Sequence, residues 1–296
     1  MIDRALYLPE SWTEDAERRD EARVPRAIAF TTKPKQGLAM LERARAAGVP
    51  FASVEPKAGS TWVAGDSVYG ADHAIRRWAE RHRCGYVLAV TSGQRLGARP
   101  VTDWIEDLPE DTWQRLSAGE GTKGPRLYDW AYIPYRGGAE GFRCALLVRR
   151  SVAKPAELAF HLTQAPEATT LAELVRVAGA RWTIESCFEQ AKGEVGLDQY
   201  EVRSWVGWHR HVTLSMLALA YLAAVRKAAI GGCGPHKLRC RVAAHDGARG
   251  APPTLASRLV APTQTRCCPA MVELAQAPPA TRAPLPLAQA NTGPTA

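Results

Sequence analysis

No run of apolar residues in this sequence reaches the length of a membrane-spanning helix. The longest, VTLSMLALAYLAAV at residues 212–225, is too short to cross a bilayer and contains Thr213 and Ser215. It therefore predicts a buried helix of the core. Met1 is not followed by an apolar signal region either. Both absences favour a cytoplasmic protein.

The seven cysteines form no recognisable disulfide framework, because their number is odd and they are widely scattered. This usage is typical of a reduced, cytoplasmic protein. The closest approach to a zinc site is Cys233, His236 and Cys240, with Cys267 and Cys268 beyond. That spacing fits no standard finger and lies in low-complexity sequence, so we favour the interpretation without zinc.

What the chain does have is enough apolar residues for a core and an excess of positive charge. Of its 296 residues, 46% are hydrophobic, and the formal net charge is +8. The charge favours an anionic partner, but it does not separate a nucleic-acid partner from a generally basic surface.

The first 94 residues alternate between helical and strand-like patterns, which predicts an α/β core. Residues 1–9 resemble a strand, and a polar helix follows, with Ser11 or Thr13 as its N-cap. Helical periodicity then covers 33–50 and 72–83, and strand patterns cover 51–56, 61–65 and 85–92.

The remainder divides into three further regions. Residues 95–170 are punctuated by Gly and Pro and contain strand candidates at 126–135 and 142–152, so we expect a β-rich insertion. Residues 171–230 return to helical periodicity, as a helical remainder of the core. Residues 231–296 are rich in Ala and Pro, which predicts a disordered tail.

The segment RWTIESCFEQAK at 181–192 places three charged side chains on one stripe of a helix. Arg181, Glu185 and Lys192 stand at i, i+4 and i+11, which at about 100° per residue point within about 40° of one another. The bland interpretation is an i,i+4 ion pair on a solvated face. The functional one is an acid held between two bases at the edge of the core.

Asp66 is a second carboxylate of interest, because it directly follows an apolar strand in VAGDSVYG. The carboxyl end of a strand is where α/β folds place their chemistry, although aspartates there are also common turn formers. A carboxylate at a strand end and Glu185 on a bordering helix can together ligate hard divalent cations through oxygen.

The segment RWTIESCFEQAKGEVGLDQYEVRSW resembles the third-acid region of DDE insertion-sequence transposases, specifically the insertion sequence 701 family of the insertion sequence 4 clan. The clan's Tyr-x2-Arg-x3-Glu-x6-Lys signature falls on Ala178, Arg181, Glu185 and Lys192, so that only the Tyr differs. IDRALYLPESWTED, GVPF, GDSVYG, YVLAVTSGQR and LSAGEGTKGPRLYDWA are similar to the family in the same order.

This resemblance implies a ribonuclease-H-like fold in which Asp66 is the second acid and Glu185 the third. The two would bind metal as part of a two-Mg²⁺ site, with Arg181 and Lys192 on DNA phosphates. The implied activity is cleavage and joining of double-stranded DNA at transposon ends and targets.

The family also requires a first acid, which lies on the opening strand in a segment resembling DETGF. This sequence contains no such segment. We therefore expect a partial core without its opening strands, truncated at the N-terminus and inactive. Asp3 is rejected as a substitute because it belongs to a stretch that matches a later part of the family. EPKAGST at 55–61 reads as an insertion before the Asp66 strand. The alternative is a non-catalytic remnant that binds DNA or a partner and inhibits an intact transposase by pairing with it. A weaker third alternative is a ribonuclease-H-like nuclease of unrelated purpose. Self-association is a further partner interaction that we consider.

Two further groups have functional and structural interpretations. Trp130 and Tyr132 would stack on an unpaired base, or pack on the insertion's sheet, which we favour. His209, Arg210 and His211 would touch phosphates, or simply begin a helix.

Overall fold

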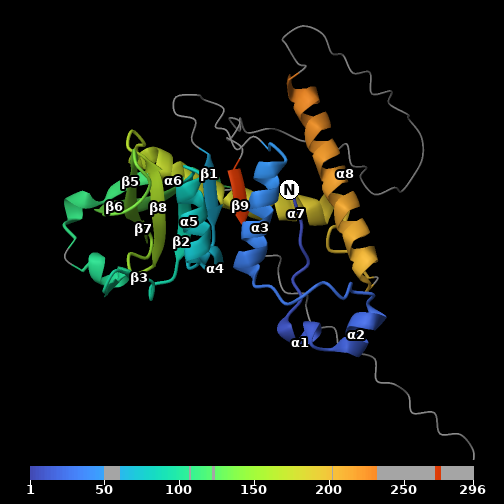
Figure 1. The fold of residues 1–296 in the computed structure, drawn as a ribbon. Helices are drawn as coiled ribbons and strands as arrows, with labels where there is room; N and C mark the ends of the chain where they lie inside the picture. The colour runs from blue at the N-terminus through green and yellow to red at the C-terminus, as the bar shows by residue number, and fades with distance from the viewer. Residues whose placement is uncertain (50–60, 107, 122–123, 202, 232–270, 275–296) are drawn as a thin grey trace, which may run out of the picture.

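A seven-stranded mixed sheet forms the centre of the computed structural model, which describes residues 1–49, 61–106, 108–121, 124–201, 203–231 and 271–274 (Figure 1). Its strand order is β5-β6-β7-β8-β2-β1-β9. The strands are β1 (Trp62–Gly65), β2 (Gly85–Val90), β5 (Gln114–Gly121), β6 (Gly124–Tyr135), β7 (Phe142–Ser151), β8 (Leu158–Pro166) and β9 (Met271–Leu274), with a separate hairpin of β3 (Arg95–Leu96) and β4 (Arg99–Pro100).

The helices lie before, between and after these strands. They are α1 (Glu10–Thr13), α2 (Ala16–Glu21), α3 (Lys33–Ala46), α4 (Ser67–Gly70), α5 (His73–Arg81), α6 (Leu171–Ala180), α7 (Trp182–Val195) and α8 (Trp205–Gly231), with 3₁₀ helices η2 (Val101–Trp104) and η3 (Glu110–Thr112). The helices expected at 33–50 and 72–83, and the strands expected at 61–65, 85–92, 126–135 and 142–152, are therefore confirmed within a few residues.

The sheet joins two halves of different character. β1 runs parallel to β2 and to β9, whereas β5, β6, β7 and β8 form an antiparallel meander. The two halves meet where β8 pairs antiparallel with β2. The segment expected to be a β-rich insertion thus supplies four strands that continue the core sheet; its division into a separate unit stays a prediction.

Each face of the sheet is covered by its own helices, and alternation along β1 and β2 separates the two cores. Val63 and Leu88 face a cluster with Ile75 and Trp78 of α5, whereas Trp62 and Val87 belong to a second cluster. In that second cluster they pack with buried residues of α6. Consecutive residues of each strand thus point to opposite faces of the sheet and pack in different cores, as the pleat of a strand requires.

The end of α6 packs directly on the backbone of β5. A Cβ atom on Gly179 would lie 1.8 Å from the carbonyl oxygen of Ala118, so only glycine permits this approach. Arg126 of β6 bridges the two elements, because its Nη2 donates to Ala118 O at 2.6 Å and to Gly179 O at 3.0 Å. The Arg126 guanidinium also lies 5.0 Å from the ring of Trp182, the first residue of α7.

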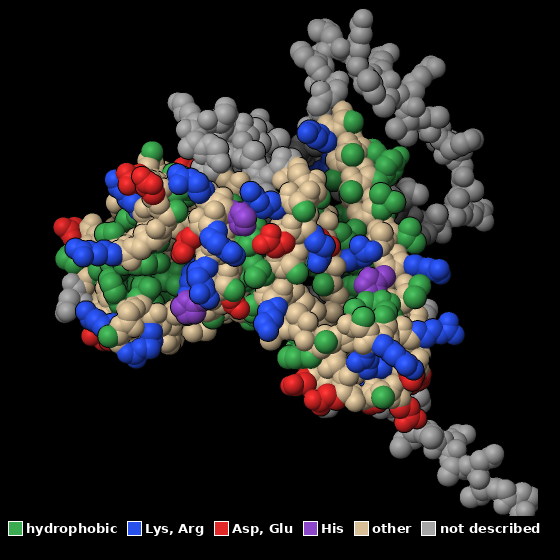
Figure 2. Space-filling model, in the orientation of Figure 1, with side chains coloured by type: hydrophobic (Ala, Val, Ile, Leu, Met, Phe, Trp, Pro, Cys, Tyr) green, Lys and Arg blue, Asp and Glu red, His purple; other side chains and the backbone are tan. Residues whose placement is uncertain are grey.

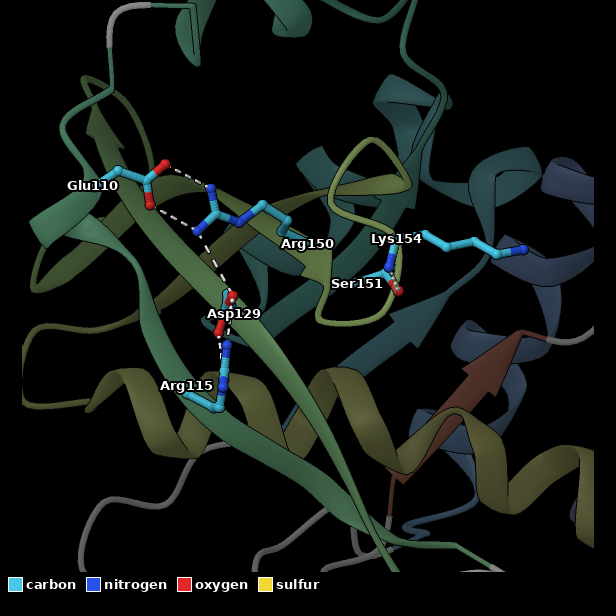
Figure 3. Close-up of polar contacts among 6 residues, drawn as sticks. All are labelled: Glu110, Arg115, Asp129, Arg150, Ser151 and Lys154. Carbon is cyan, nitrogen blue, oxygen red and sulfur yellow. Dashed lines mark hydrogen bonds and ion pairs between the residues drawn. The ribbon is translucent and has the colours of Figure 1, made fainter.

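An alternating chain of charges fixes η3 to the antiparallel half of the sheet (Figure 3). Arg150 donates to both oxygens of Glu110, at 3.0 and 2.9 Å, and lies 3.7 Å from Asp129. Asp129 also receives two hydrogen bonds from Arg115. These hydrogen bonds lower the pKa of Asp129. The network joins β5, β6 and β7 side by side, so we assign it a structural role.

The expectation that residues 212–225 form a buried core helix is wrong. They lie in α8, which is 27 residues long, and Leu214, Leu217 and Tyr221 are 65%, 65% and 68% exposed. The helix extends beyond the apolar run in both directions. As a result α8 is, by length and composition alone, the one helix among the described residues that would suffice to cross a membrane. Apolar composition indicated burial, but no described element covers this face.

The N-terminal segment also differs from expectation. Residues 1–9 contain no strand, and the polar helix is split into α1 and α2. The cap of α2 is Asp15, whose Oδ1 accepts from Arg18 N at 2.9 Å, and neither Ser11 nor Thr13 has this role. Leu8 instead packs with Ala22 and Val24 in a small separate cluster, so apolar residues that suggested a strand cover the α2 region.

Several expectations fall on residues 50–60, 232–270 and 275–296, which lie outside the described part of the chain. They are the strand expected at 51–56, all but the last residue of the EPKAGST insertion, the Cys233–Cys268 group and most of the tail expected to be disordered. Within that tail, β9 pairs with the edge of β1.

His161 lies on β8 and is half-buried. Its Nδ1 is buried without a hydrogen-bond partner, and its ring centroid lies 6.2 Å from that of Trp130. Burial lowers the pKa of His161 to about 4, and the positive charges of Arg149 and Arg181 act in the same direction. The imidazole is therefore neutral at physiological pH.

We expect Gly179→Ala to lower the free energy of unfolding by about 1–3 kcal/mol, because a methyl group cannot fit against the Ala118 carbonyl without moving α6. Urea denaturation measures the effect. Gly193→Ala in α7 is the matched control, since a Cβ there meets nothing within 4 Å. That change should stabilise the protein by up to about 1 kcal/mol. Equal effects of the two substitutions would contradict the packing argument.

Stability should also fall in acid through His161. Its folded pKa of about 4 lies below the unfolded value of 6.5, so the unfolded state binds the extra proton between these values. The contribution of His161 to the free energy of unfolding is complete above pH 6.5. It is lost as the pH falls towards 4, by about 3 kcal/mol in total. Denaturation at several pH values should show this slope in the parent, and His161→Gln should reduce it. An unchanged slope would show that the pKa of His161 is the same in the folded and unfolded states.

Candidate active site

Asp66 lies at the carboxyl end of β1, next to the parallel strand β2. It is the N-cap of α4, because its Oδ1 accepts from Val68 N at 2.9 Å. No described residue donates to its other oxygen, Oδ2. The half-buried side chain therefore has one oxygen committed to the helix and one available to a ligand.

The turn that carries Asp66 is held against the sheet by Gly70. A Cβ atom on Gly70 would lie 1.9 Å from the carbonyl oxygen of Ala89 in β2, so α4 also packs backbone to backbone on a strand. Tyr69 is buried beside it, and burial, followed by the neighbouring Asp66 carboxylate, raises the pKa of Tyr69 to about 12. The strand end is thus a rigid position for a carboxylate.

Glu185 lies in the first turn of α7, just beyond the Gly179–Ala118 contact. Its Oε1 accepts from Arg181 Nη2 at 2.9 Å, and the side chains of Arg181 and Glu185 are 44% and 53% exposed. The bland interpretation, an i,i+4 pair on a solvated face, is therefore confirmed. Pairs this exposed contribute at most about 1 kcal/mol, so the carboxylate can leave Arg181 for a stronger ligand at little cost.

α7 packs against α8. Ala191 is fully buried, and Ser215 of α8 donates to the carbonyl of Val195 at 3.3 Å. Lys192 lies on the charged stripe and is half-buried. One edge of α7 therefore presents Arg181, Glu185 and Lys192 along a single line beside its packed face.

The two acids come from elements that α6 connects. α6 contacts β1 and β2, where its buried residues share a cluster with Trp62 and Val87, and it contacts β5 where Gly179 precedes α7. Among the residues described, however, no group of three or more His, Cys, Asp or Glu side chains gathers as a metal site would require. The close approach of Asp66 and Glu185, within about 10 Å for a metal pair, stays a prediction.

Arg126 is the residue near this site that the sequence analysis missed. Burial lowers the pKa of the Arg126 guanidinium, and the negative charge of nearby Glu185 acts in the opposite direction. Its sequence neighbours, RLYDW, indicate only a strand. The contact that makes Arg126 relevant joins residues 53 positions apart, Arg126 and Gly179, and no local pattern could have found it.

Of the secondary candidates, Trp130 has the structural role that we favoured. It is 1% exposed and packs in the cluster below α6, so it is not free to stack on a base, and Tyr132 packs against the same cluster.

The histidines of WVGWHRH also serve the fold. His209 Nδ1 lies 2.8 Å from Trp205 O, and His211 Nε2 lies 3.3 Å from Leu197 O. Arg210 between them is exposed, so of the three only Arg210 is open to a phosphate.

Asp3 is likewise engaged away from the site, as expected. The Oδ2 atom of Asp3 accepts a hydrogen bond from Nε of Arg43 in α3 at 2.9 Å and lies 2.7 Å from Nη2 of the same guanidinium. Its Oδ1 atom accepts from the backbone N–H of Arg4. It lies in a segment without a strand, whereas the sequence placed it on one, and its rejection as the first acid stays a prediction.

A family model described as DDE superfamily endonuclease matches residues 1–104, the segment that contains β1, Asp66 and β2. No curated protein matches the chain. The match supports a DDE transposase-type family, with the nuclease activity on DNA and the use of divalent metals that this family implies, and the mixed α/β fold is consistent with it.

Proposed function

We propose that this chain derives from an insertion-sequence transposase of the insertion sequence 701 type, built on a ribonuclease-H-like core for metal-dependent cleavage and transfer of DNA strands. The DDE endonuclease match carries this proposal, because it covers the strand-end Asp66 and the parallel strands beside it. Glu185 lies beyond the matched residues, and its assignment rests on the RWTIESCFEQAK signature.

The chemistry of the donors suits Mg²⁺, a hard cation that prefers carboxylate oxygens. Asp66 would contribute Oδ2 while its Oδ1 keeps the α4 cap, and Glu185 would leave its exposed pair with Arg181. When bound, Mg²⁺ lowers the pKa of water and neutralises charge on a phosphodiester. Two carboxylates are fewer ligands than a metal pair needs, and the described residues gather no third.

Arg181 and Lys192 would then position DNA phosphates along the same edge of α7. A guanidinium released by Glu185 has its planar donors free for a bidentate phosphate contact, and Lys192 adds a point charge further along the helix. Figure 2 shows Lys and Arg side chains spread over the sheet region and α8, whereas acidic side chains are prominent at the lower end, near α1 and α2.

Because only two candidate carboxylate ligands are present among the described residues, we also propose that these 296 residues alone do not cleave DNA. The function left to such a chain is that of a non-catalytic remnant, which binds double-stranded DNA or an intact transposase and inhibits it. We place this activity in the bacterial cytoplasm, on the nucleoid.

Metal binding should be weak and should depend on both acids. We expect Asp66→Asn and Glu185→Gln each to reduce Mn²⁺ affinity by about tenfold or more, measured by electron paramagnetic resonance of free Mn²⁺. Asparagine keeps an oxygen for the α4 cap, so Asp66→Asn removes the charge and leaves the turn intact.

Two substitutions of the same chemistry serve as controls. Asp72→Asn alters the cap of α5, which accepts from Ala74 N, and Glu189→Gln alters an exposed acid one turn beyond Glu185. Neither should change Mn²⁺ affinity. Equal losses in all four variants would show non-specific binding and would end the assignment of Asp66 and Glu185.

Binding to double-stranded DNA should be weak, independent of sequence and steeply dependent on salt. Arg181→Gln and Lys192→Gln should each reduce the slope of log affinity against log salt by about 0.9, which corresponds to one phosphate contact. Mobility shifts at several salt concentrations measure the slope. Arg18→Gln, in α2, is the control and should leave it unchanged. Tight binding to one sequence at high salt would contradict the proposal.

A further inference from the structure

Arg76 of α5 is a buried cation that forms no ion pair with any carboxylate in the described part of the chain. It is only 8% exposed and is one of four buried residues in α5. Its Nη1 atom donates to the carbonyl oxygen of Gly70, and its Nη2 atom lies 2.8 Å from Nδ1 of His73. Burying a charge without a counter-charge costs free energy. Stability alone therefore does not account for a guanidinium at this position.

Gly70 connects Arg76 to Asp66 through two consecutive hydrogen bonds. The carbonyl of Gly70 accepts from Arg76, and the N–H of Gly70 donates to the backbone carbonyl of Asp66 at 2.8 Å. The helix between them, α4, is a single turn of four residues. A displacement of Gly70 therefore passes directly to the backbone of Asp66.

Two contacts fix the position of Gly70. The backbone carbonyl of Ala89 blocks its movement towards β2, because even a Cβ atom would lie 1.9 Å from that oxygen. The hydrogen bond from Arg76 ties the same residue to α5. The direction of Asp66 is thus set by α5 as well as by its own strand.

We propose that Arg76 is a positioning residue for Asp66. By holding the Gly70 carbonyl, its guanidinium fixes the turn that Asp66 caps through Oδ1, and so fixes the direction of Oδ2. This inference deepens the proposed function and rests on it, because the direction of Oδ2 affects a ligand only if Asp66 binds metal. Groups that orient a metal ligand typically change metal affinity by about 10–100-fold when they are removed.

A guanidinium suits this role because its planar fork can engage two partners at once. Nη1 bonds to Gly70 while Nη2 contacts His73 at the start of α5, so contacts on two residues fix the plane of the group. A lysine at this position would carry the same charge on a single nitrogen. It would not hold both partners in the same geometry.

The first test needs no metal, and it follows amide hydrogen exchange in the full chain by nuclear magnetic resonance. Arg76→Met replaces the buried charge with an apolar side chain, so the fold should tolerate it. We expect the amides of Val68 and Gly70 to exchange at least tenfold faster in this variant. The amide of Leu174, in the first turn of α6, is the internal control and should be unchanged.

The second test measures the affinity for Mn²⁺ by electron paramagnetic resonance of free Mn²⁺. Arg76→Met should lower the affinity by about tenfold in the parent and should have no further effect in an Asp66→Asn background. Arg77→Met is the matched control, since it removes the same charge from an exposed neighbour on the same helix. Loss of a positive charge by itself favours cation binding, so a lower affinity cannot come from long-range electrostatics.

Arg76→Lys keeps the charge and one donor, and it gives the same tests if Arg76→Met proves too unstable to purify. It should change exchange and affinity in the same direction, by a smaller factor.

The outcomes separate this inference from the proposed function. Unchanged exchange in α4, or an equal loss of Mn²⁺ affinity with and without the Asp66 carboxylate, would overturn the positioning role alone. Faster exchange with unchanged Mn²⁺ affinity would also overturn it and would leave Arg76 a purely structural role. If Asp66→Asn itself left Mn²⁺ affinity unchanged, the proposed metal site would fail, and the positioning role would fail with it.

Discussion

Backbone-to-backbone packing of helices on strands at two glycines sets the positions of both candidate acids. Gly70 brings α4 against the Ala89 carbonyl four residues after Asp66, and Gly179 brings α6 against the Ala118 carbonyl six residues before Glu185. A side chain at either position would push its helix off the sheet. Because protein interiors are close-packed, that displacement would pass directly to the neighbouring carboxylate.

The same constraint explains why the antiparallel meander matters to the site. β5 and β6 supply the Ala118 carbonyl and the Arg126 guanidinium that hold the end of α6. Trp182 then stacks on Arg126 as α7 begins. The strands expected to form an insertion are therefore the support on which Glu185 rests, and they extend the sheet that begins with β1 and β2.

The electrostatic setting of the two acids differs, and the difference follows from their positions. Asp66 is half-buried, with one oxygen committed to a helix cap, so its direction is set by the backbone. Glu185 is exposed and paired with Arg181, so it can exchange partners. A rigid acid and an adjustable one suit a site that assembles around a cation and a phosphate.

Local sequence patterns determined much of the parallel half of the fold and the identity of the candidate residues. The helical periodicity of 33–50 and 72–83, the strand before Asp66 and the Arg181–Glu185 pair all depend on neighbours within a few residues, and the structure has each of them. Tertiary structure alone decided the rest. Continuation of the sheet from β2 to β8, the Arg126–Gly179 contact and the exposure of α8 depend on segments far apart in the chain. An apolar run predicts that a surface will be covered, but only the packing of the whole molecule decides whether its own residues cover it.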